Sequence, residues 1–271
     1  MADWQRILEH CAQNMQTEIL KVYQTAEAGK GFGRGAGGDI KKKIDLVAES
    51  ALAETLRADK ASCTLISEES GAKKIGAESS EYILVADPLD GTTNALRGVP
   101  FMAVSLAVAH KPYLKCVETA LVTDILHNVT YTAQKDEGAF KNKQSIKPSE
   151  TTSLNEAVVG VDFNSFKAGE IVSQMIRVLE LTKHLRHLGA NALELCYVAD
   201  GTIDAFIDIR GKLRVTDMAA AQLILREAGG IITTQKGEGL DAPLTATQRV
   251  SFIAAANETI YTKIREFIKK S

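Results

Sequence analysis

Two carboxylates three residues apart stand directly after an apolar run of the chain. Asp87 and Asp90 belong to the segment Asp87-Pro-Leu-Asp-Gly-Thr-Thr-Asn94, and residues 82–86 before it have the composition of a buried strand. Carboxylates at the mouth of a buried strand cost free energy unless an opposite charge neutralises them. The pattern favours a cation at this point, although two aspartates at this spacing are usually only an acidic turn that caps the backbone.

The residues after the first aspartate suit the binding of an anion beside that cation. Pro88 fixes its own φ and helps to hold the turn. Gly91, Thr92 and Thr93 would expose backbone N–H groups if a short helix starts there, and such a helix end binds phosphate. Metal-binding carboxylates beside phosphate-binding amides are the arrangement that two-metal phosphoryl transfer needs.

Other acidic residues lie in three distant segments. Glu68 and Glu69 follow another strand-like run, Asp217 falls at the start of a predicted helix, and Asp45 lies in a lysine-rich segment. Taken singly, the glutamate pair would be a solvated turn, Asp217 a helix N-cap and Asp45 part of a surface salt bridge. Taken together with Asp87, they form a set of carboxylates without a Cys or a metal-spaced His pair. Such a set selects a hard cation, for which Mg²⁺ is the natural choice.

Two predicted helices flank a glycine-rich segment near the N-terminus. Apolar residues recur at helical spacing over residues 3–28 and again over residues 44–56. The glycines between residues 29 and 38 predict a mobile loop, which we interpret as a flap near the metals. Asp39 is placed to cap the second helix. Residues 33–38 match G-x-G-x-x-G, but a helix precedes them in place of a strand, which argues against a dinucleotide-binding fold.

The rest of the chain predicts two sheets. Short β-type runs follow one another directly after residue 62, which predicts an antiparallel sheet, and strands alternate with helices after a turn-rich segment at residues 138–152. His184 and His187 lie in one of these strands, where a spacing of three places them on opposite faces, so we interpret them as structural. We expect an α/β fold, a layered α+β sandwich with the metal site between two subdomains. An antiparallel sheet with a helix pair would span residues 1–150, and a smaller mixed-sheet subdomain would span residues 151–271.

Composition excludes several classes of protein. Hydrophobic residues make up 45% of the 271 residues, charged residues 24%, and the formal net charge is −2. This charge gives no reason to expect nucleic acid or an anionic membrane as a partner. The four cysteines are scattered without a CxxC pair, which is typical of reduced thiols. No apolar run approaches the ~20 residues of a membrane span, so we expect a soluble, cytoplasmic protein.

These segments together resemble the inositol monophosphatase family, and most of all its archaeal members that act on fructose 1,6-bisphosphate as well as inositol phosphate. Residues 87–94 are similar to the family's DPxDGTTN signature and residues 68–70 to its EES element. Residues 217–230 are similar to its second signature, which runs from D-x-A-A to E-A-G-G. The resemblance covers residues 37–231, with the motifs in the family's order, and implies a sugar-phosphatase fold, a homodimer and inhibition by lithium.

The resemblance also implies a role for each matched residue. Metal would be bound by the side chains of Glu68, Asp87, Asp90 and Asp217 and by the carbonyl oxygen of Leu89. Two or three Mg²⁺ ions would occupy the site, with Mn²⁺ as a substitute. Asp45, Glu68 and Thr92 would be catalytic, with Asp45 and Thr92 orienting or activating the attacking water. The contacts to phosphate and substrate would come from Asp90, Gly91, Thr92, Thr93, Arg186, Gly189, Asn191 and Asp208.

Three positions depart from the family pattern. Lys42 stands where the family often has Thr, as in the archaeal branch, Thr216 stands in place of a Trp, and Ala221 in place of a Gly. None of them removes a predicted metal ligand.

A basic cluster precedes the late aspartate. Arg210, Lys212 and Arg214 would lie at one edge of the site, where they could bind a second phosphate. This favours a bisphosphate such as fructose 1,6-bisphosphate, and a charged loop in water is the alternative.

The sequence therefore predicts a Mg²⁺-dependent phosphomonoesterase that hydrolyses a small sugar or cyclitol phosphate with a metal-activated water. Fructose 1,6-bisphosphate and inositol 1-phosphate are the favoured substrates. No phosphoenzyme is required, because the DxDx(T/V) arrangement of a nucleophilic Asp is absent. Two alternatives stay open: a phosphatase of the nucleotide 3'-phosphoadenosine 5'-phosphate, and a catalytically silent regulatory protein on the same fold.

Overall fold

The computed structural model describes residues 3–77, 80–164 and 168–268. The helices are α1 Trp4–Val22, α2 Lys43–Ala58, α3 Thr92–Arg97, α4 Gly169–Leu181, α5 Asn191–Ala199, α6 Ala219–Glu227 and α7 Glu258–Phe267, with short 3₁₀ helices η1 Leu114–Cys116 and η2 Val215–Asp217. The strands are β1 Gly31–Arg34, β2 Ile40–Lys42, β3 Cys63–Ser67, β4 Gly71–Ile75, β5 Ile83–Asp90, β6 Ala103–Ala109, β7 Val117–Asp124, β8 Val129–Gln134, β9 Gly138–Lys141, β10 Gln144–Ser145, β11 Val158–Val161, β12 His184–Arg186, β13 Ala205–Arg214, β14 Ile231–Thr233 and β15 Arg249–Ala255.

Two large sheets organise these strands. The first has eight strands in the order β10-β9-β8-β7-β6-β5-β3-β4, and the second has five in the order β12-β11-β13-β15-β14. In the first sheet β3 and β5 are parallel and the other neighbouring pairs are antiparallel. In the second sheet β11 is parallel to β12 and β13, while β15 is antiparallel to β13 and β14. The predicted mixed second sheet is confirmed, and the first sheet contains one parallel pair that was not expected.

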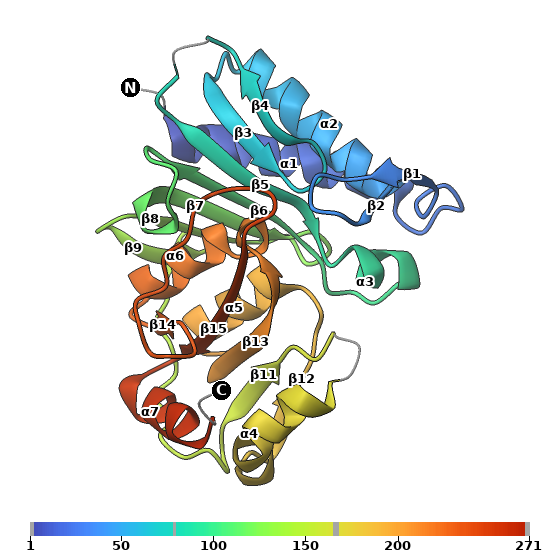
Figure 1. The fold of residues 1–271 in the computed structure, drawn as a ribbon. Coiled ribbons are helices and arrows are strands. Elements are labelled where there is room, and N and C mark those ends of the chain that lie inside the picture. Colours follow the sequence, from blue (N-terminus) through green and yellow to red (C-terminus); the bar gives the residue numbers. More distant parts are fainter. Residues whose placement is uncertain (1–2, 78–79, 165–167, 269–271) are drawn as a thin grey trace.

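The elements stack in five layers, from helices through sheet, helices and sheet to helices (Figure 1). Helices α1 and α2 share one hydrophobic cluster with one face of the first sheet. Helices α5 and α6 lie in the cluster between the two sheets, and α4 and α7 cover the outer face of the second sheet. Because both faces of β5 are covered, its residues Leu84 and Val85 are buried on opposite sides. The layered α/β sandwich expected from the sequence is confirmed.

The two halves of the chain build different sheets. All strands of the eight-stranded sheet end by Ser145, and the five-stranded sheet begins at Val158. However, α5 and α6 come from the second half of the chain and pack against the first sheet as well. The division near residue 150 into two subdomains stays a prediction.

The glycine-rich segment differs from its prediction. Where the sequence predicted a loop, residues 31–42 form an antiparallel pair of strands, β1 and β2, and the mobility of this segment stays a prediction. Its turn lies against the residues after β3, since the amide of Gly37 donates to the carbonyl oxygen of Glu68 at 2.8 Å. A Cβ at Gly37 would lie 3.0 Å from Glu68 Cγ and 3.1 Å from Arg214 Nη1. Glycine is therefore used here for close approach of the backbone.

The helix ends near this segment also differ from the sequence reading. Helix α1 ends at Val22 because Tyr23 is extended and Gln24 has a φ of 60°. Asp39 does not cap α2. That helix begins after Lys42, whose amide donates to the carboxylate of Asp45 at 3.0 Å.

Two further expectations concern the membrane and the thiols. Among the described helices, none is both long enough and apolar enough to cross a membrane. All four cysteines are free, and Cys11, Cys63 and Cys196 are buried.

Helix α1 supplies a direct test of the outer layer. Leu8 is fully buried against the first sheet, whereas Leu20 on the same helix is 43% exposed. We expect Leu8→Ala to lower the free energy of unfolding by about 2–5 kcal/mol, because it leaves a cavity in a packed layer. The same change at Leu20 should cost about 0.5 kcal/mol or less. Urea denaturation of both variants measures the difference, and equal losses would contradict the packing described.

Candidate active site

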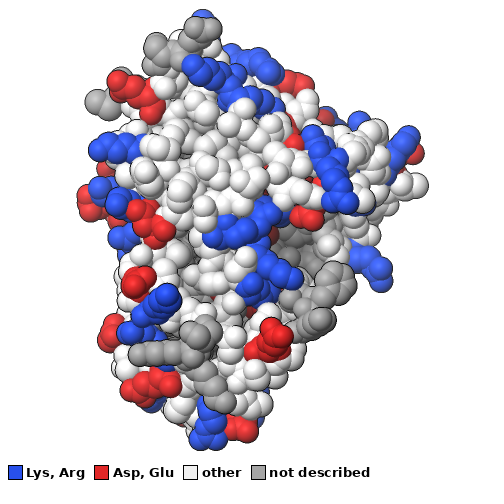
Figure 2. Space-filling view, viewed as in Figure 1, with Lys and Arg blue, Asp and Glu red and all other residues white. Residues whose placement is uncertain are grey.

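A cavity of about 940 Å³ lies where the two sheets meet. It is lined by the residues after β3, the end of β5, the starts of α2, α3 and α5, and the end of β13. On the face shown in Figure 2, basic side chains gather at the middle of the molecule, where the surface is hollowed. The basic residues that line this cavity are Lys42, Arg210, Lys212, Arg214 and Arg249.

Three carboxylates from distant segments meet in this cavity. One carboxylate oxygen from each of Glu68, Asp87 and Asp217 lies within 4.8 Å of the other two. Because β3 and β5 are parallel neighbours with Ser67 opposite Ala86, their ends bring the first two residues side by side. Asp217 arrives from the second sheet, at the end of the 3₁₀ helix that follows β13.

The fourth predicted acidic ligand is close by but bonded differently. Asp90 lines the same cavity and is buried, and its Oδ2 accepts a hydrogen bond from the amide of Ala192 at 2.7 Å. Ala192 lies in the first turn of α5, where unpaired amides favour a negative charge. A register shift between Asp87 and Asp90 accompanies Pro88, which has no N–H to donate to β6. The two aspartates of the signature thus have different partners.

A hydroxyl group stands between two acceptors at the start of α3. Thr92 Oγ1 lies 2.9 Å from Asp45 Oδ1 and 3.1 Å from the carbonyl oxygen of Leu89. Asp45 is buried, and burial is the main cause that raises the pKa of its carboxyl group. The structure therefore brings together the residues that the sequence assigned to water activation.

The acidic cluster is electrostatically strained. Burial first, and then the charge of Asp87, raises the pKa of Glu68 to about 10. Burial and the charge of Asp217 raise the pKa of Asp87 to about 8, and burial raises that of Asp90 well above its ordinary value. Oxygen donors that are this costly to ionise alone fit a hard divalent cation, which offsets their charge. Glu68, Asp87 and Asp217 are the residues that would hold it.

One arginine already lies among these carboxylates. Arg214 Nη1 forms an ion pair with Glu68 Oε1, and its Nε lies 3.1 Å from Asp217 Oδ1. The same Nη1 also lies 2.8 Å from Asp39 Oδ2, on the turn between β1 and β2. The side chain of Arg214 is 16% exposed; burial lowers the pKa of its guanidinium, but the charges of Asp217, Glu68 and Asp87 outweigh burial and raise the pKa above the ordinary value. A positive charge therefore occupies the cluster that the sequence assigned to metal.

The predicted phosphate and substrate contacts converge on the same cavity. Gly91 takes a φ of 90° directly before α3, and a Cβ there would lie 3.0 Å from the carbonyl oxygen of Phe101. Asn94 fixes this corner, since its Nδ2 donates to the carbonyl oxygens of Phe101 and Leu188. The predicted residues that line the cavity are Asp45, Glu68, Asp87, Leu89, Asp90, Gly91, Thr92, Thr93, Gly189, Asn191, Arg210, Lys212 and Asp217.

Two predicted substrate residues do not line the cavity. Arg186 is exposed, and its Nη1 donates to the carbonyl oxygen of Leu185 at 2.8 Å. Asp208 is fully buried beneath Arg210, to whose Nη2 its Oδ2 is bonded at 2.5 Å. Arg210 Nη2 also contacts Asp162 Oδ2 at 2.6 Å, so its charge is balanced by two aspartates. A role for these residues in binding substrate stays a prediction.

Other residues of the cavity were missed or misread from the sequence. Strand β12 ends at Arg186, so His187 lies beyond the strand and lines the cavity, 3.9 Å from Asp162. Glu69 is buried, and burial raises its pKa to about 7. The sequence assigned no cavity role to Asp162, to His187 or to Glu69, although Glu69 lies in the EES element, because their positions depend on tertiary contacts.

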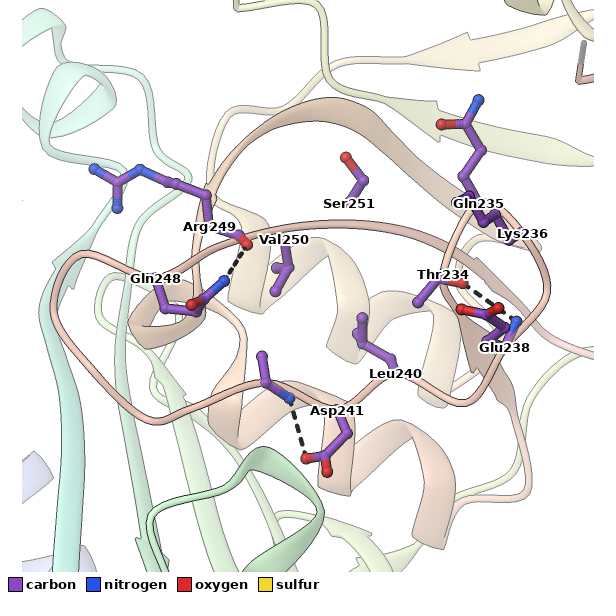
Figure 3. Close-up of a pocket in the computed structure, with 11 residues that line it drawn as sticks. Thr234, Gln235, Lys236, Glu238, Leu240, Asp241, Gln248, Arg249, Val250 and Ser251 are labelled. Carbon is purple, nitrogen blue, oxygen red and sulfur yellow. Dashed lines mark hydrogen bonds between the residues drawn. The ribbon is translucent and has the colours of Figure 1, made fainter. Parts of the chain in front are cut away.

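Arg249 is the least expected member of the cavity. It pairs with Arg214 across β13 and β15, and its Nη2 donates to the carbonyl oxygen of Gly37 at 2.8 Å. Its Nη1 is buried without a hydrogen-bond partner among the described residues. Its main chain also borders a second cavity of about 620 Å³, from which the side chain points away (Figure 3). Arg249 thus adds a further positive charge beside the acidic cluster.

Known proteins are similar to this chain in sequence and in fold. The model of the family described as "Inositol monophosphatase family" matches residues 3–270. The fructose-1,6-bisphosphatase/inositol-1-monophosphatase of Methanothermobacter thermautotrophicus is 36% identical over 274 residues, which cover 98% of this chain and 96% of that protein. The Nus factor SuhB of Salmonella typhimurium is 34% identical over 235 residues, which cover 85% of each chain. A crystal structure described as an inositol monophosphatase-fructose 1,6 bisphosphatase matches with a TM-score of 0.86 at 29% identity, and covers 98% of this chain and 100% of that one.

The raised pKa values predict how metal binding depends on pH. Because burial and the charge of Asp217 raise the pKa of Asp87 to about 8, its carboxyl group is mostly protonated at pH 7 in the metal-free protein, whereas Glu68 is paired with Arg214. A cation must displace this proton, so the apparent association constant should rise between pH 6 and 8, by up to about tenfold per pH unit. Calorimetric Mg²⁺ titrations in buffers of different ionisation enthalpy count the protons released.

The raised carboxyl pKa also determines whether the stability of the metal-free protein rises or falls with pH. An unfolded Asp loses its proton near the ordinary value of 3.8, well below the folded value of about 8 for Asp87. The metal-free protein should therefore lose stability as the pH rises through this window. Asp87→Asn should release one proton fewer on binding Mg²⁺. A metal affinity that does not change with pH would show that the carboxyl group of Asp87 is ionised without the cation.

Proposed function

The chain belongs to the inositol monophosphatase family, and from this membership and the geometry of the cavity we propose that it is a Mg²⁺-dependent phosphomonoesterase. Its substrate would be a small sugar or cyclitol phosphate, with fructose 1,6-bisphosphate and inositol 1-phosphate as the first candidates. The observation that carries the proposal is the meeting of Glu68, Asp87 and Asp217, whose oxygens lie within 4.8 Å of one another in a cavity of about 940 Å³.

The donor set supports Mg²⁺ among the common metals. The cluster consists of carboxylates, without a His or Cys among its members. Mg²⁺ prefers such oxygen ligands and keeps several waters, and Mn²⁺ accepts the same donors. The ligand set proposed here is Glu68, Asp87 and Asp217, with Asp90 and the carbonyl oxygen of Leu89 beside them. When bound, the metal would offset the charge of the phosphate and lower the pKa of the attacking water.

The chain's own groups have distinct tasks in this scheme. Thr92 Oγ1 can donate its proton to Asp45 Oδ1 at 2.9 Å and at the same time accept a hydrogen bond from a water in the cavity. The Thr92–Asp45 pair would thereby orient the attacking water and take up its proton. Gly91 and Thr92 line the same cavity, where their amides would bind the phosphate oxygens.

The name of the archaeal relative supports the choice of substrate. The Methanothermobacter protein is named for both fructose 1,6-bisphosphate and inositol 1-phosphate, and 98% of this chain aligns with it. Lys212 is exposed at the edge of the cavity. Lys212 and Arg210 are the two candidate contacts for a second phosphate, and the charge of Arg210 is balanced by Asp162 and Asp208. We further propose that the enzyme works in the cytoplasm as a homodimer, with a small phosphate ester as its partner.

A substrate panel tests the proposal. We expect Mg²⁺-dependent release of phosphate from fructose 1,6-bisphosphate or inositol 1-phosphate, and little from 3'-phosphoadenosine 5'-phosphate. Asp87→Asn should lower kcat by at least about 10²–10³-fold, because it removes charge where the transition state needs it. Asp241→Asn makes the same chemical change at an aspartate bonded to Lys115, outside this cavity, and should leave kcat unchanged.

A catalytically silent protein is the alternative of a different class. The similarity to a protein named as a Nus factor supports testing the hypothesis of a regulatory protein. Phosphate release at the same rate from wild type and Asp87→Asn would mean that this cluster is not the catalytic centre. Release from none of the three substrates at saturating Mg²⁺ would favour the regulatory protein.

A further inference from the structure

Arg214 has the position of a built-in counter-ion. Its guanidinium contacts Glu68, Asp217 and Asp39 at once, and two of these three belong to the acidic cluster. The side chain is 16% exposed, so water screens these contacts only in part. A buried guanidinium among buried carboxylates supplies the charge compensation that a cation would otherwise supply.

The space for this guanidinium is shaped by the glycine hairpin. A Cβ at Gly37 would lie 3.1 Å from Arg214 Nη1 and 3.3 Å from its Cδ, so a larger residue would press on the side chain. Gly37 is fixed on both sides, since its amide donates to Glu68 and its carbonyl oxygen accepts from Arg249. The close fit of residues from three segments indicates a defined position for Arg214.

The oxygens of Glu68 and Asp217 that contact Arg214 cannot bind a metal at the same time without competition. Glu68 Oε1 accepts from Arg214 Nη1, and Asp217 Oδ1 lies 3.1 Å from its Nε. A divalent cation bound between these oxygens would also repel the guanidinium at short range. Binding of one positive charge therefore opposes binding of the other.

Asp39 offers the arginine a place outside the cluster. Its Oδ2 already lies 2.8 Å from Arg214 Nη1, and its side chain is 78% exposed on the turn of the hairpin. If Arg214 gives up Glu68, its existing contact with Asp39 can remain. The hairpin therefore supplies both Gly37, which packs against the side chain of Arg214, and Asp39, its ion-pair partner outside the cluster.

We infer that Arg214 competes with the divalent cation for the acidic cluster, holding Glu68, Asp217 and Asp39 in the metal-free protein and keeping only Asp39 when the metal binds. This inference rests on the proposed function, since it requires a metal at the cluster. It assigns Arg214 as a positioning residue that sets the affinity of the site, and Asp39 as the residue that holds it in the metal-bound protein.

Calorimetric titration of Mg²⁺ into the metal-free protein tests the competition. Arg214→Met should bind Mg²⁺ more tightly by about tenfold or more, because the metal no longer displaces a buried ion pair. Its metal-free form should melt at a lower temperature than wild type. A structural role alone would predict weaker binding, so unchanged or weaker affinity would overturn the inference. Arg249→Met is the matched control: it removes the same charge from the partner strand, does not free Glu68, and should shift the affinity by less.

Asp39→Asn tests the outer position with an exposed side chain that the fold tolerates. It should weaken Mg²⁺ binding a few-fold in wild type, because the displaced arginine loses its partner. In the Arg214→Met background the same change should have no effect, whereas a general loss of negative charge would weaken binding equally in both. Equal effects would contradict the exchange. If wild type itself does not bind Mg²⁺, the proposed function fails, and that result is distinct from a wild type that binds with no gain in Arg214→Met.

Discussion

Repulsion between buried carboxylates is the constraint on which the rest of the structure depends. Two ionised oxygens 4.8 Å apart repel each other by about 3.5 kcal/mol at an effective dielectric constant near 20. The fold gathers three such groups and adds Asp90 and Asp45 nearby. This arrangement is stable only with protons, an arginine or metal ions among the oxygens, which is why the cluster carries both raised carboxyl pKa values and a buried guanidinium.

The packed layers of sheets and helices fix the positions of these charged side chains. Parallel pairing of β3 and β5 sets Glu68 beside Asp87, and helices on both faces of the first sheet keep these strand ends from shifting. The second sheet brings Arg214 and Asp217 to the same point from the end of β13. Asp90 then fixes the start of α5, which packs between the sheets. The site is thus positioned by every layer except the outer pair of helices α4 and α7.

The part of the site predictable from the sequence is the part encoded in short motifs. The order of residue types from Asp87 to Asn94, together with Glu68 and Asp217, indicated a cation beside a phosphate, and the structure brings these residues together. Arg249 could not be predicted, because it reaches the cavity through cross-strand pairing with Arg214. The strand pair β1–β2 was not predicted, because the local freedom of glycine says nothing of a tertiary contact that needs the absence of a Cβ.

The position of the cluster between the sheets gives the cation a second consequence. Glu68 follows β3 and Asp87 lies in β5, both strands of the first sheet. Arg214 is the last residue of β13 in the second sheet, and Asp217 follows three residues later. In the metal-free protein the ion pair from Arg214 to Glu68 therefore joins the two sheets across the cavity, while its contact with Asp217 is local. A metal held by Glu68, Asp87 and Asp217 would make the same connection with more charge. An exchange of the two cations thus preserves the link between the sheets, so the cavity need not open when the metal enters.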